Sequence, residues 1–142
     1  MSDIKRISPQ EASEKVAAGW TYLDVRTVEE FDQGHPAGSV NVPISFAGPG
    51  GMEPNPDFVR VIKAAFAPDA KIVVGCKAGG RSLRAAQILA GEGFTNILDQ
   101  RCGWDGARDA FGRLEPGWSR VGLPSETGQP AGRSWSDMKT KA

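Results

Sequence analysis

The chain has 142 residues, 39% of them hydrophobic, which is enough for one domain with a single core. Its 17 basic and 17 acidic residues balance, so the net charge gives no indication of a nucleic-acid or membrane-surface partner. No apolar run is long enough to span a bilayer, and the chain start lacks an apolar signal core, so we expect a cytoplasmic protein without membrane contact.

Strand and helix signals alternate along the chain. Ser8 and Thr27 are each followed three positions later by a glutamate, Glu11 or Glu30, a capping-box pattern that predicts a helix start. The expected strands are residues 4–7, 21–26, 39–43, 71–75 and 95–99. Helices are expected after Ser8, after Thr27, from Asp57 to Pro68, after Ser82 and from Trp104 to Leu114.

This alternation predicts an α/β fold: a central parallel sheet of about five strands with helices on both faces. Residues 46–56 are rich in glycine and proline and are expected to form a surface loop, either a lid, a docking surface or a simple connector. The domain is expected to span residues 1–123, with Trp118 and Leu123 packing on it. Residues 124–142 are expected to form an irregular, flexible tail.

Cys76 is the candidate reactive residue, because it lies between an apolar strand and a helix start. Helix amino termini present unpaired N–H groups and partial positive charge, which favour a thiolate. Gly79 and Gly80 allow the loop to curl around an anion, and Lys77 and Arg81 add positive charge. The alternative is a buried structural cysteine.

The other groups capable of chemistry are few. Cys76 and Cys102 cannot form a disulfide scaffold, and together with His35 they lack the spacing of a metal site, so we expect free thiols, no metal and no cofactor. For His35, proton transfer and a structural role that holds the loop before the third strand are both open, and the structural role is preferred.

Four stretches occur in the order and at the spacing of one known family: residues 23–26, 30–31, 34–43 and 76–82. With them, the chain resembles a single-domain rhodanese, a sulfurtransferase, over residues 4–123. The resemblance implies a rhodanese-like fold in which Cys76 attacks the outer sulfur of thiosulfate and carries that sulfur as a persulfide. Cyanide, a thiol or a protein then accepts the sulfur.

The resemblance also implies roles for the residues around Cys76. Asp24 and Arg26 would support the active loop, with Asp24 as a partner for Arg81. The partners would be a small anionic sulfur donor and a thiol or protein acceptor; the oligomeric state is open, with a monomer preferred. The residues of the substrate-binding loop would be Lys77, Ala78, Gly79, Gly80, Arg81 and Ser82.

The same residues also bear on alternatives to a sulfurtransferase. Cysteine phosphatases use a longer loop than the four residues that separate Cys76 from Arg81, so phosphate chemistry is disfavoured. A rhodanese-like binding or regulatory module, with incidental activity, stays as the second hypothesis. Cys102 stands where the family usually has glycine; it would either approach Cys76 as a second thiol that resolves the persulfide or senses redox state, or simply occupy a turn.

Overall fold

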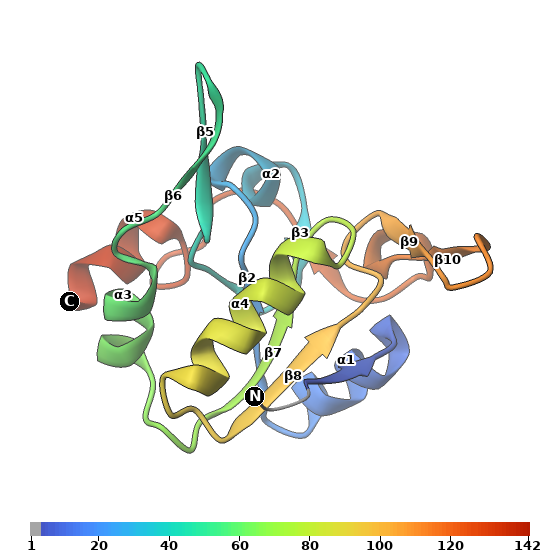
Figure 1. Cartoon of the computed structure of the whole chain (residues 1–142), viewed down its shortest axis with the longest axis horizontal. Helices are drawn as coiled ribbons and strands as arrows, with labels where there is room; N and C mark the ends of the chain where they lie inside the picture. Colours follow the sequence, from blue (N-terminus) through green and yellow to red (C-terminus); the bar gives the residue numbers. More distant parts are fainter. Residues whose placement is uncertain (1–3) are drawn as a thin grey trace.

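A parallel five-stranded sheet forms the centre of the computed structural model, which describes residues 4–142 (Figure 1). All neighbouring strands in it are parallel, so the expected α/β fold is confirmed. Residues 1–3 lie outside the described residues. They are part of the expected domain and of the chain start for which no apolar signal core was expected. Across the sheet the strands are β1 (Lys5–Ile7), β8 (Asn96–Gln100), β7 (Lys71–Gly75), β2 (Thr21–Asp24) and β4 (Val40–Asn41).

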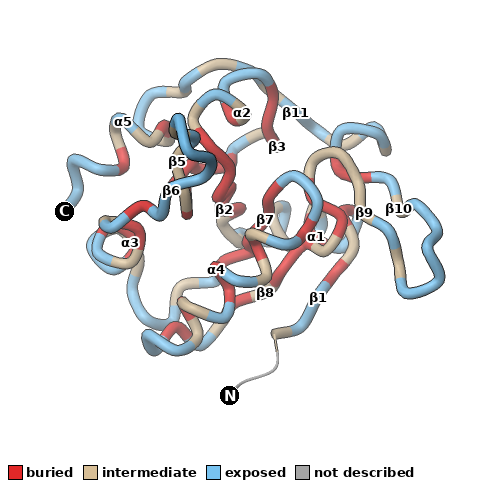
Figure 2. Tube along the Cα trace, turned by 45° about the horizontal axis from the view of Figure 1, so that its top comes forward, coloured by how far each residue is buried: buried red, intermediate tan, exposed pale blue. Residues whose placement is uncertain are grey.

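Helices cover both faces of this sheet, as expected. Along β7, the side chains of Ile72 and Val74 enter one apolar cluster and that of Val73 enters the other, because successive strand residues point to opposite faces. All three are fully buried, and in the chain trace the central strands are largely buried whereas the edge strand β1 is mostly exposed (Figure 2). The α-helices are α1 (Pro9–Ala17), α2 (Val28–Gln33), α3 (Phe58–Ala65), α4 (Gly80–Gly91) and α5 (Trp135–Met138).

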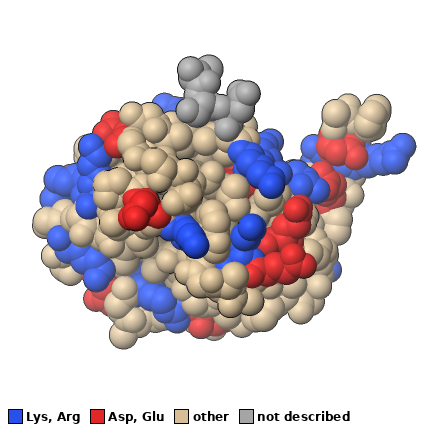
Figure 3. Space-filling model, turned by 90° about the horizontal axis from the view of Figure 1, so that it is seen from below, with Lys and Arg blue, Asp and Glu red and all other residues tan. Residues whose placement is uncertain are grey.

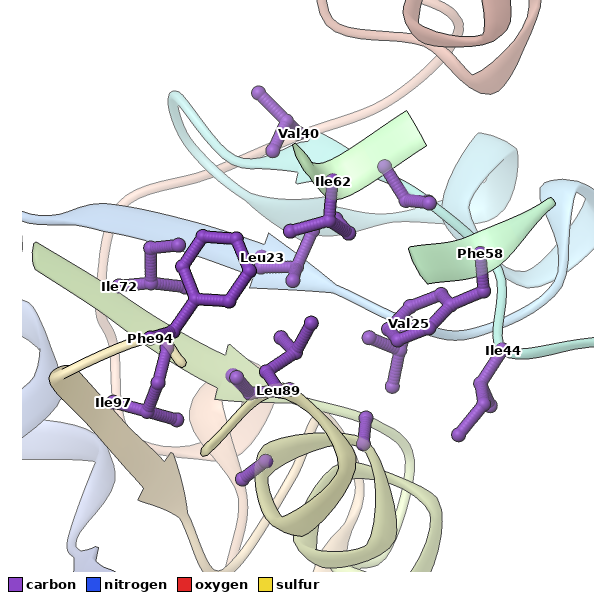
Figure 4. Close-up of a cluster of buried hydrophobic side chains, with 14 of the residues drawn as sticks. Leu23, Val25, Val40, Ile44, Phe58, Ile62, Ile72, Leu89, Phe94 and Ile97 are labelled. Carbon is purple, nitrogen blue, oxygen red and sulfur yellow. The ribbon is translucent and has the colours of Figure 1, made fainter. Parts of the chain in front are cut away.

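The larger cluster lies between the sheet and helices α3 and α4 (Figure 4). Phe58 and Ile62 of α3 and Leu89 of α4 pack there, which is the apolar stripe that the sequence predicted for both helices. On the opposite face, Ala12 of α1 and Trp118 of the 3-10 helix η1 (Trp118–Arg120) form the smaller cluster. Among the described helices, none is long and apolar enough to cross a membrane.

Both predicted capping boxes are present. The Ser8 side chain accepts a hydrogen bond from the backbone N–H of Glu11, and the Glu11 carboxylate accepts one from the Ser8 backbone. Thr27 and Glu30 make the same reciprocal pair at the start of α2. Each box satisfies backbone donors that a helix start leaves free, so local sequence alone determines where these two helices begin.

Two expectations about single segments were wrong. Where a surface loop was expected at 46–56, the chain forms an antiparallel hairpin of β5 (Ser45–Gly48) and β6 (Gly51–Pro54), and its glycines and proline form the turn. Where a helix was expected at 104–114, the chain forms a second hairpin of β9 (Gly106–Arg108) and β10 (Leu114–Pro116).

The second hairpin has a physical reason in its glycines. Gly103, Gly106 and Gly112 have positive φ angles of 65°, 127° and 78°, which a helix does not accommodate. Trp104 at the start of the segment packs against the smaller cluster, but Phe111 is 83% exposed and Leu114 59%. The far end of the segment therefore has no buried apolar side chain that would hold a helix on the core.

The prediction of an irregular tail at 124–142 was also wrong. Strand β11 (Ser125–Glu126) pairs with β3 (His35–Pro36), and α5 is followed by the 3-10 helix η2 (Lys139–Lys141). Met138 is buried in the larger cluster, against which Trp135 also packs. Trp118 and Leu123 lie in or against the smaller cluster, as expected. Trp135 and Met138 are too few to give a periodic signal, which explains why the sequence pattern missed this segment.

Candidate active site

Cys76 directly follows the last residue of β7, and three residues separate it from the start of α4. This is the position between a strand and a helix that the sequence predicted. It lies at the carboxyl edge of the parallel sheet, where ligands bind in folds of this class. The residue is only 2% exposed, so its sulfur is enclosed by the surrounding loop and does not lie on an open surface.

Two groups of the loop contact the Cys76 sulfur. The backbone N–H of Gly79 donates to Sγ at 3.0 Å, and the Cys76 thiol donates to Ser82 Oγ at 3.4 Å. The sulfur also lies at the amino terminus of the 12-residue helix α4, where the helix dipole is positive. This environment stabilises negative charge on sulfur, whether on a thiolate or on a persulfide.

Gly79 is required for the shape of the loop. Its φ of 93° lies in the left-handed region, and a Cβ atom there would lie 2.3 Å from the carbonyl oxygen of Arg101. At Gly80, by contrast, a Cβ atom would meet nothing within 4 Å. The two adjacent glycines of the sequence pattern therefore differ: the first is needed for the backbone turn, whereas a side chain could be accommodated at the second.

The loop cations are paired with acidic residues. Arg81 donates to both carboxylate oxygens of Glu30, at 2.8 and 3.0 Å, and Lys77 Nζ lies 3.8 Å from Asp105. Although burial opposes it, hydrogen bonds from Arg81 and Thr27 lower the pKa of Glu30 to about 2. The positive charge expected of this loop is therefore largely balanced.

The expected Asp24–Arg81 pair does not form. Asp24 instead makes a buried ion pair with Arg26, at 2.7 Å, because the two side chains share the turn after β2. Arg26 also donates to the carbonyl oxygen of Gly34 at 2.6 Å and lies over the ring of Trp104 at 5.2 Å. The pair joins the turn after β2 to the segment that follows β8.

The segment after β8 is bonded to the Cys76 loop through the backbone. Trp104 N donates to Cys76 O at 2.8 Å and Asp105 N to Lys77 O at 3.0 Å. At Gly103 a Cβ atom would lie 2.4 Å from Lys77 backbone atoms, so only glycine permits this approach. Trp104 and Asp105 line a polar pocket with Lys77 and residues of the α2 side.

Cys102 is buried in this same segment, and both cysteines are free thiols. Burial, with the nearby carboxylate of Glu115, raises the pKa of Cys102 to about 11. Its charged neighbours include Arg101 as well as Glu115. The Cys102 thiol is therefore in its neutral form at neutral pH.

His35 lies apart from this chemistry. Its ring stacks on Phe31 with centroids 3.6 Å apart, and its nitrogens bond the Phe31 carbonyl oxygen and the Glu126 carboxylate, at 2.7 and 3.1 Å. Both ring nitrogens are thus engaged in joining α2 to β11. Within residues 4–142, no group of three or more His, Cys, Asp or Glu side chains could hold a metal ion.

Comparisons with known proteins address the family directly. Residues 8–110 match the family model described as the rhodanese-like domain. The chain belongs to the rhodanese family. Over 120 residues, 84% of this chain and 91% of the other, it is 39% identical to thiosulfate sulfurtransferase 16, chloroplastic, of Arabidopsis thaliana. It is 32% identical to thiosulfate sulfurtransferase GlpE of Ectopseudomonas mendocina, over 91% of this chain and 96% of that protein.

A solved structure also resembles this chain. Rv0390 from M. tuberculosis matches with a TM-score of 0.73 and 26% identity, over 89% of this chain and 100% of that one. The match to the senescence-associated protein DIN1 of Raphanus sativus spans 48% of that protein, so some relatives are about twice as long as the shared region. At the level of the family, these relatives support a rhodanese-type sulfurtransferase.

Two residues of this rhodanese site were missed in the sequence. Glu30 was recognised as a helix cap and as part of a family stretch, but not as the partner of Arg81, which its carboxylate binds. Arg6 gave no signal at all: from β1 it donates to the carbonyl oxygen of Gly79 at 3.0 Å and to Asp99 at 2.7 Å. Arg6 lies before the part of the chain that matches the family model, and only the β1–β8 pairing brings it to the loop.

Proposed function

We propose that this rhodanese domain transfers the outer sulfur of thiosulfate, or of a protein persulfide, to cyanide or a thiol through a persulfide on Cys76. One observation carries the proposal: the Cys76 sulfur accepts a hydrogen bond from Gly79 N–H at the amino terminus of α4. A sulfur placed there is stabilised as an anion both before and after it receives a second sulfur.

In the first step the Cys76 thiolate attacks the outer sulfur of thiosulfate. A sulfur–sulfur bond forms to Cys76, the sulfur–sulfur bond of thiosulfate breaks, and sulfite leaves with the electron pair. In the second step the acceptor attacks the outer sulfur of the persulfide, and Cys76 returns as a thiolate. No external oxidant or reductant is consumed over the cycle, because the outer sulfur changes only its carrier.

The residues around Cys76 have distinct roles in this proposal. Arg81 and Lys77 retain N–H donors toward an anionic donor, although Glu30 and Asp105 balance their charges. Asp24 and Arg26 hold the turn after β2 against Trp104. Figure 3, which views the molecule from below, shows basic and acidic side chains interspersed over that face. At the loop itself Glu30 pairs with Arg81 and Asp105 with Lys77, so local hydrogen bonds rather than a broad positive field would bind the donor.

A binding or regulatory module is the second candidate. The intact nucleophile, with its N–H donor and helix terminus in place, favours catalysis over a purely recognitional role. The two differ in one measurable property, because only an enzyme must release the sulfur repeatedly. Turnover with thiosulfate and cyanide therefore separates them.

The experiment is intact mass spectrometry of the reduced protein after incubation with thiosulfate. We expect one added sulfur atom, which cyanide removes as thiocyanate. Cys76→Ser should carry no adduct, whereas the matched Cys102→Ser variant should carry it. An adduct that survives Cys76→Ser, or no adduct in the unaltered protein, would refute the proposal.

A further inference from the structure

A buried carboxylate oxygen beside the Cys76 loop lacks a hydrogen-bond donor. Asp99, in β8, is fully buried, and its Oδ2 accepts a hydrogen bond from Arg6 Nε at 2.7 Å. Its Oδ1 has no partner within the part of the chain that the structure describes. Because a buried acceptor without a donor destabilises a folded protein, the surroundings of this oxygen should contain a group that serves it.

A second acceptor in the same place has more donors than it can use. The carbonyl oxygen of Gly79 lies 3.0 Å from Arg6 Nη2, 3.3 Å from Leu83 N and 3.3 Å from Ser82 Oγ. A carbonyl oxygen has two lone pairs, so one of these three donors is in excess. The Ser82 hydroxyl is the donor that can turn away, because its hydrogen rotates about the carbon–oxygen bond.

Ser82 is the hydroxyl available to Asp99. It is fully buried in the first turn of α4, and this helix packs on both β7 and β8 (Figure 1). Burial raises the pKa of Asp99, and hydrogen bonding from Ser82 and from Arg6 opposes that increase. The hydrogen in excess at Gly79 and the oxygen that lacks one are therefore neighbours.

The same hydroxyl contacts the candidate nucleophile. The Cys76 thiol donates to Ser82 Oγ at 3.4 Å, so a lone pair of this oxygen faces the sulfur and its hydrogen can point to Asp99. The order of the three groups is thiol, hydroxyl and carboxylate, and all three residues are buried. A proton that leaves the sulfur thus has a path inside the protein.

We propose that Asp99 takes up the proton of the Cys76 thiol through the Ser82 hydroxyl. The inference rests on the proposed transfer function, which it deepens by naming the group that receives the proton. Asp99 does not touch the sulfur, so it is a positioning residue that acts through Ser82. The S–H bond of Cys76 breaks as an O–H bond forms at Ser82 Oγ, and the original hydroxyl hydrogen of Ser82 binds Asp99 Oδ1. One proton moves in total, and nothing is oxidised or reduced.

After this step every group of the network has a partner. The protonated Oδ1 of Asp99 donates to Ser82 Oγ, and the Ser82 hydroxyl donates to the thiolate beside the N–H of Gly79. Oδ2 of Asp99 still accepts from Arg6. The negative charge has moved from a buried carboxyl group, where burial disfavours it, to the sulfur at the amino terminus of α4, where the helix favours it.

The other ionisable groups that face this network keep their proton. Arg6 from β1 and Arg81 from α4 are arginines, which stay protonated in proteins. Burial raises the pKa of Tyr22 in β2, so its phenol stays neutral. The ammonium of Lys77, next to the nucleophile in the chain, is exposed and lies near Asp105. The proton is therefore exchanged between the thiol and the buried carboxylate.

A shared proton gives a recognisable pH dependence. Between the titration of Asp99 and that of Cys76, the network holds one proton, and the fraction of thiolate does not change with pH. A thiol that loses its proton to water behaves differently, because its thiolate fraction falls tenfold for each pH unit on the acidic side. The rate at which a small alkylating reagent modifies the sulfur measures this fraction.

The test follows the alkylation of Cys76 by iodoacetamide, located by peptide mass, as the pH is lowered. From about pH 7.5 to about pH 5.5 we expect the rate to change less than about threefold in the unaltered protein, and to fall about a hundredfold in Asp99→Asn. Ser82→Ala keeps the carboxylate and removes only the hydroxyl, and should show the same steep fall. Asp57→Asn, at an exposed acid that pairs with Arg60, is the matched control and should keep the shallow profile.

The direction of the change separates the relay from other roles. Removal of a negative charge near the sulfur would by itself favour the thiolate and speed alkylation at low pH, and a purely structural effect would scale the rate equally at every pH. Profiles of one shape in all variants, faster alkylation of Asp99→Asn at pH 5.5, or a shallow profile in Ser82→Ala would each overturn the inference. If Asp99→Asn does not fold, Ser82→Ala decides. If thiosulfate leaves no adduct on Cys76, the proposed function fails, whereas alkylation still reports on the proton path.

Discussion

Arg6 holds Gly79 from the edge of the sheet: its Nη2 donates to the Gly79 carbonyl oxygen at 3.0 Å across 73 positions of sequence. Its Nε is fixed by the buried carboxylate of Asp99, at 2.7 Å. Gly79 in turn directs its own N–H at the Cys76 sulfur. The strand at the sheet edge is thereby connected to the residue that would carry the sulfur.

Replacing Arg6 should reduce catalysis more than substrate binding. Arg6→Ala removes the donor to Gly79, so we expect kcat for thiosulfate and cyanide to fall about tenfold with little change in KM. Arg6→Lys keeps a charge for Asp99 but replaces two separate donor nitrogens with one, so its kcat should lie between those of the unaltered protein and Arg6→Ala. Steady-state kinetics measures both variants, with Arg60→Ala as the control, because Arg60 is an exposed residue of α3 that pairs with Asp57. An unchanged kcat in Arg6→Ala would show that the loop holds its shape without this contact.

Gly79 and Gly80 should respond differently to alanine. Gly79→Ala introduces a Cβ atom at a positive φ and against the Arg101 carbonyl, so the free energy of unfolding should fall by about 3 kcal/mol. Gly80→Ala places its Cβ atom in open space within the first turn of α4 and should not destabilise the protein. Urea unfolding of the pair measures the difference. Similar losses in both variants would contradict the steric account of Gly79.

Glu30 should stabilise the protein only above acidic pH. Its pKa in the folded protein, about 2, is below its ordinary value of 4.5, so the folded state favours its charged form. The stabilisation is complete above about pH 5 and is lost as the pH falls toward 2. Chemical unfolding of the unaltered protein and of Glu30→Gln, from about pH 7 down to about pH 2.5, should give curves that converge at the acidic end. A difference in the free energy of unfolding that stays constant with pH would mean that Glu30 is not charged in its pair with Arg81.

Cys102 should be unreactive at neutral pH. With its pKa near 11, roughly one molecule in ten thousand carries the thiolate at pH 7. We therefore expect Cys102→Ser to retain the full transfer rate, and iodoacetamide to modify Cys76 far faster than Cys102 in the folded protein. A Cys76–Cys102 disulfide found by peptide mapping after mild oxidation would instead support the second-thiol role.

Met138 should anchor the carboxyl-terminal segment to the core. Its side chain is 2% exposed within the larger cluster, so Met138→Ala should lower the free energy of unfolding by about 2 to 5 kcal/mol. Met52 in the β5–β6 hairpin is 49% exposed, and Met52→Ala should cost less than about 0.5 kcal/mol. Thermal or urea unfolding compares them. Equal stability of the two variants would mean that the tail contributes little to the fold.

The parts of the fold that local sequence encodes were predicted correctly. The capping boxes at Ser8 and Thr27 locate two helix starts through contacts three residues apart, and the continuous apolar run of β7 indicates a strand covered on both faces. The hairpin at β9–β10 was missed because its glycine conformations are decided by contacts with the Cys76 loop and with neighbouring backbone. The tail was missed because Met138 becomes an apolar anchor only once α3 and the sheet are in place.

The candidate nucleophile, its glycine-rich loop and the family were all evident in the amino-acid sequence, since Cys76 and the motif around it are contiguous in the chain. The pairing of acidic with basic side chains around Cys76 became evident only in the folded chain. Asp24 binds Arg26 rather than Arg81, and Arg81 binds Glu30. Residues distant in sequence meet where parallel strands align their carboxyl ends, so the pairing of Arg81 with Glu30 and the arrival of Arg6 at Gly79 depend on strand order.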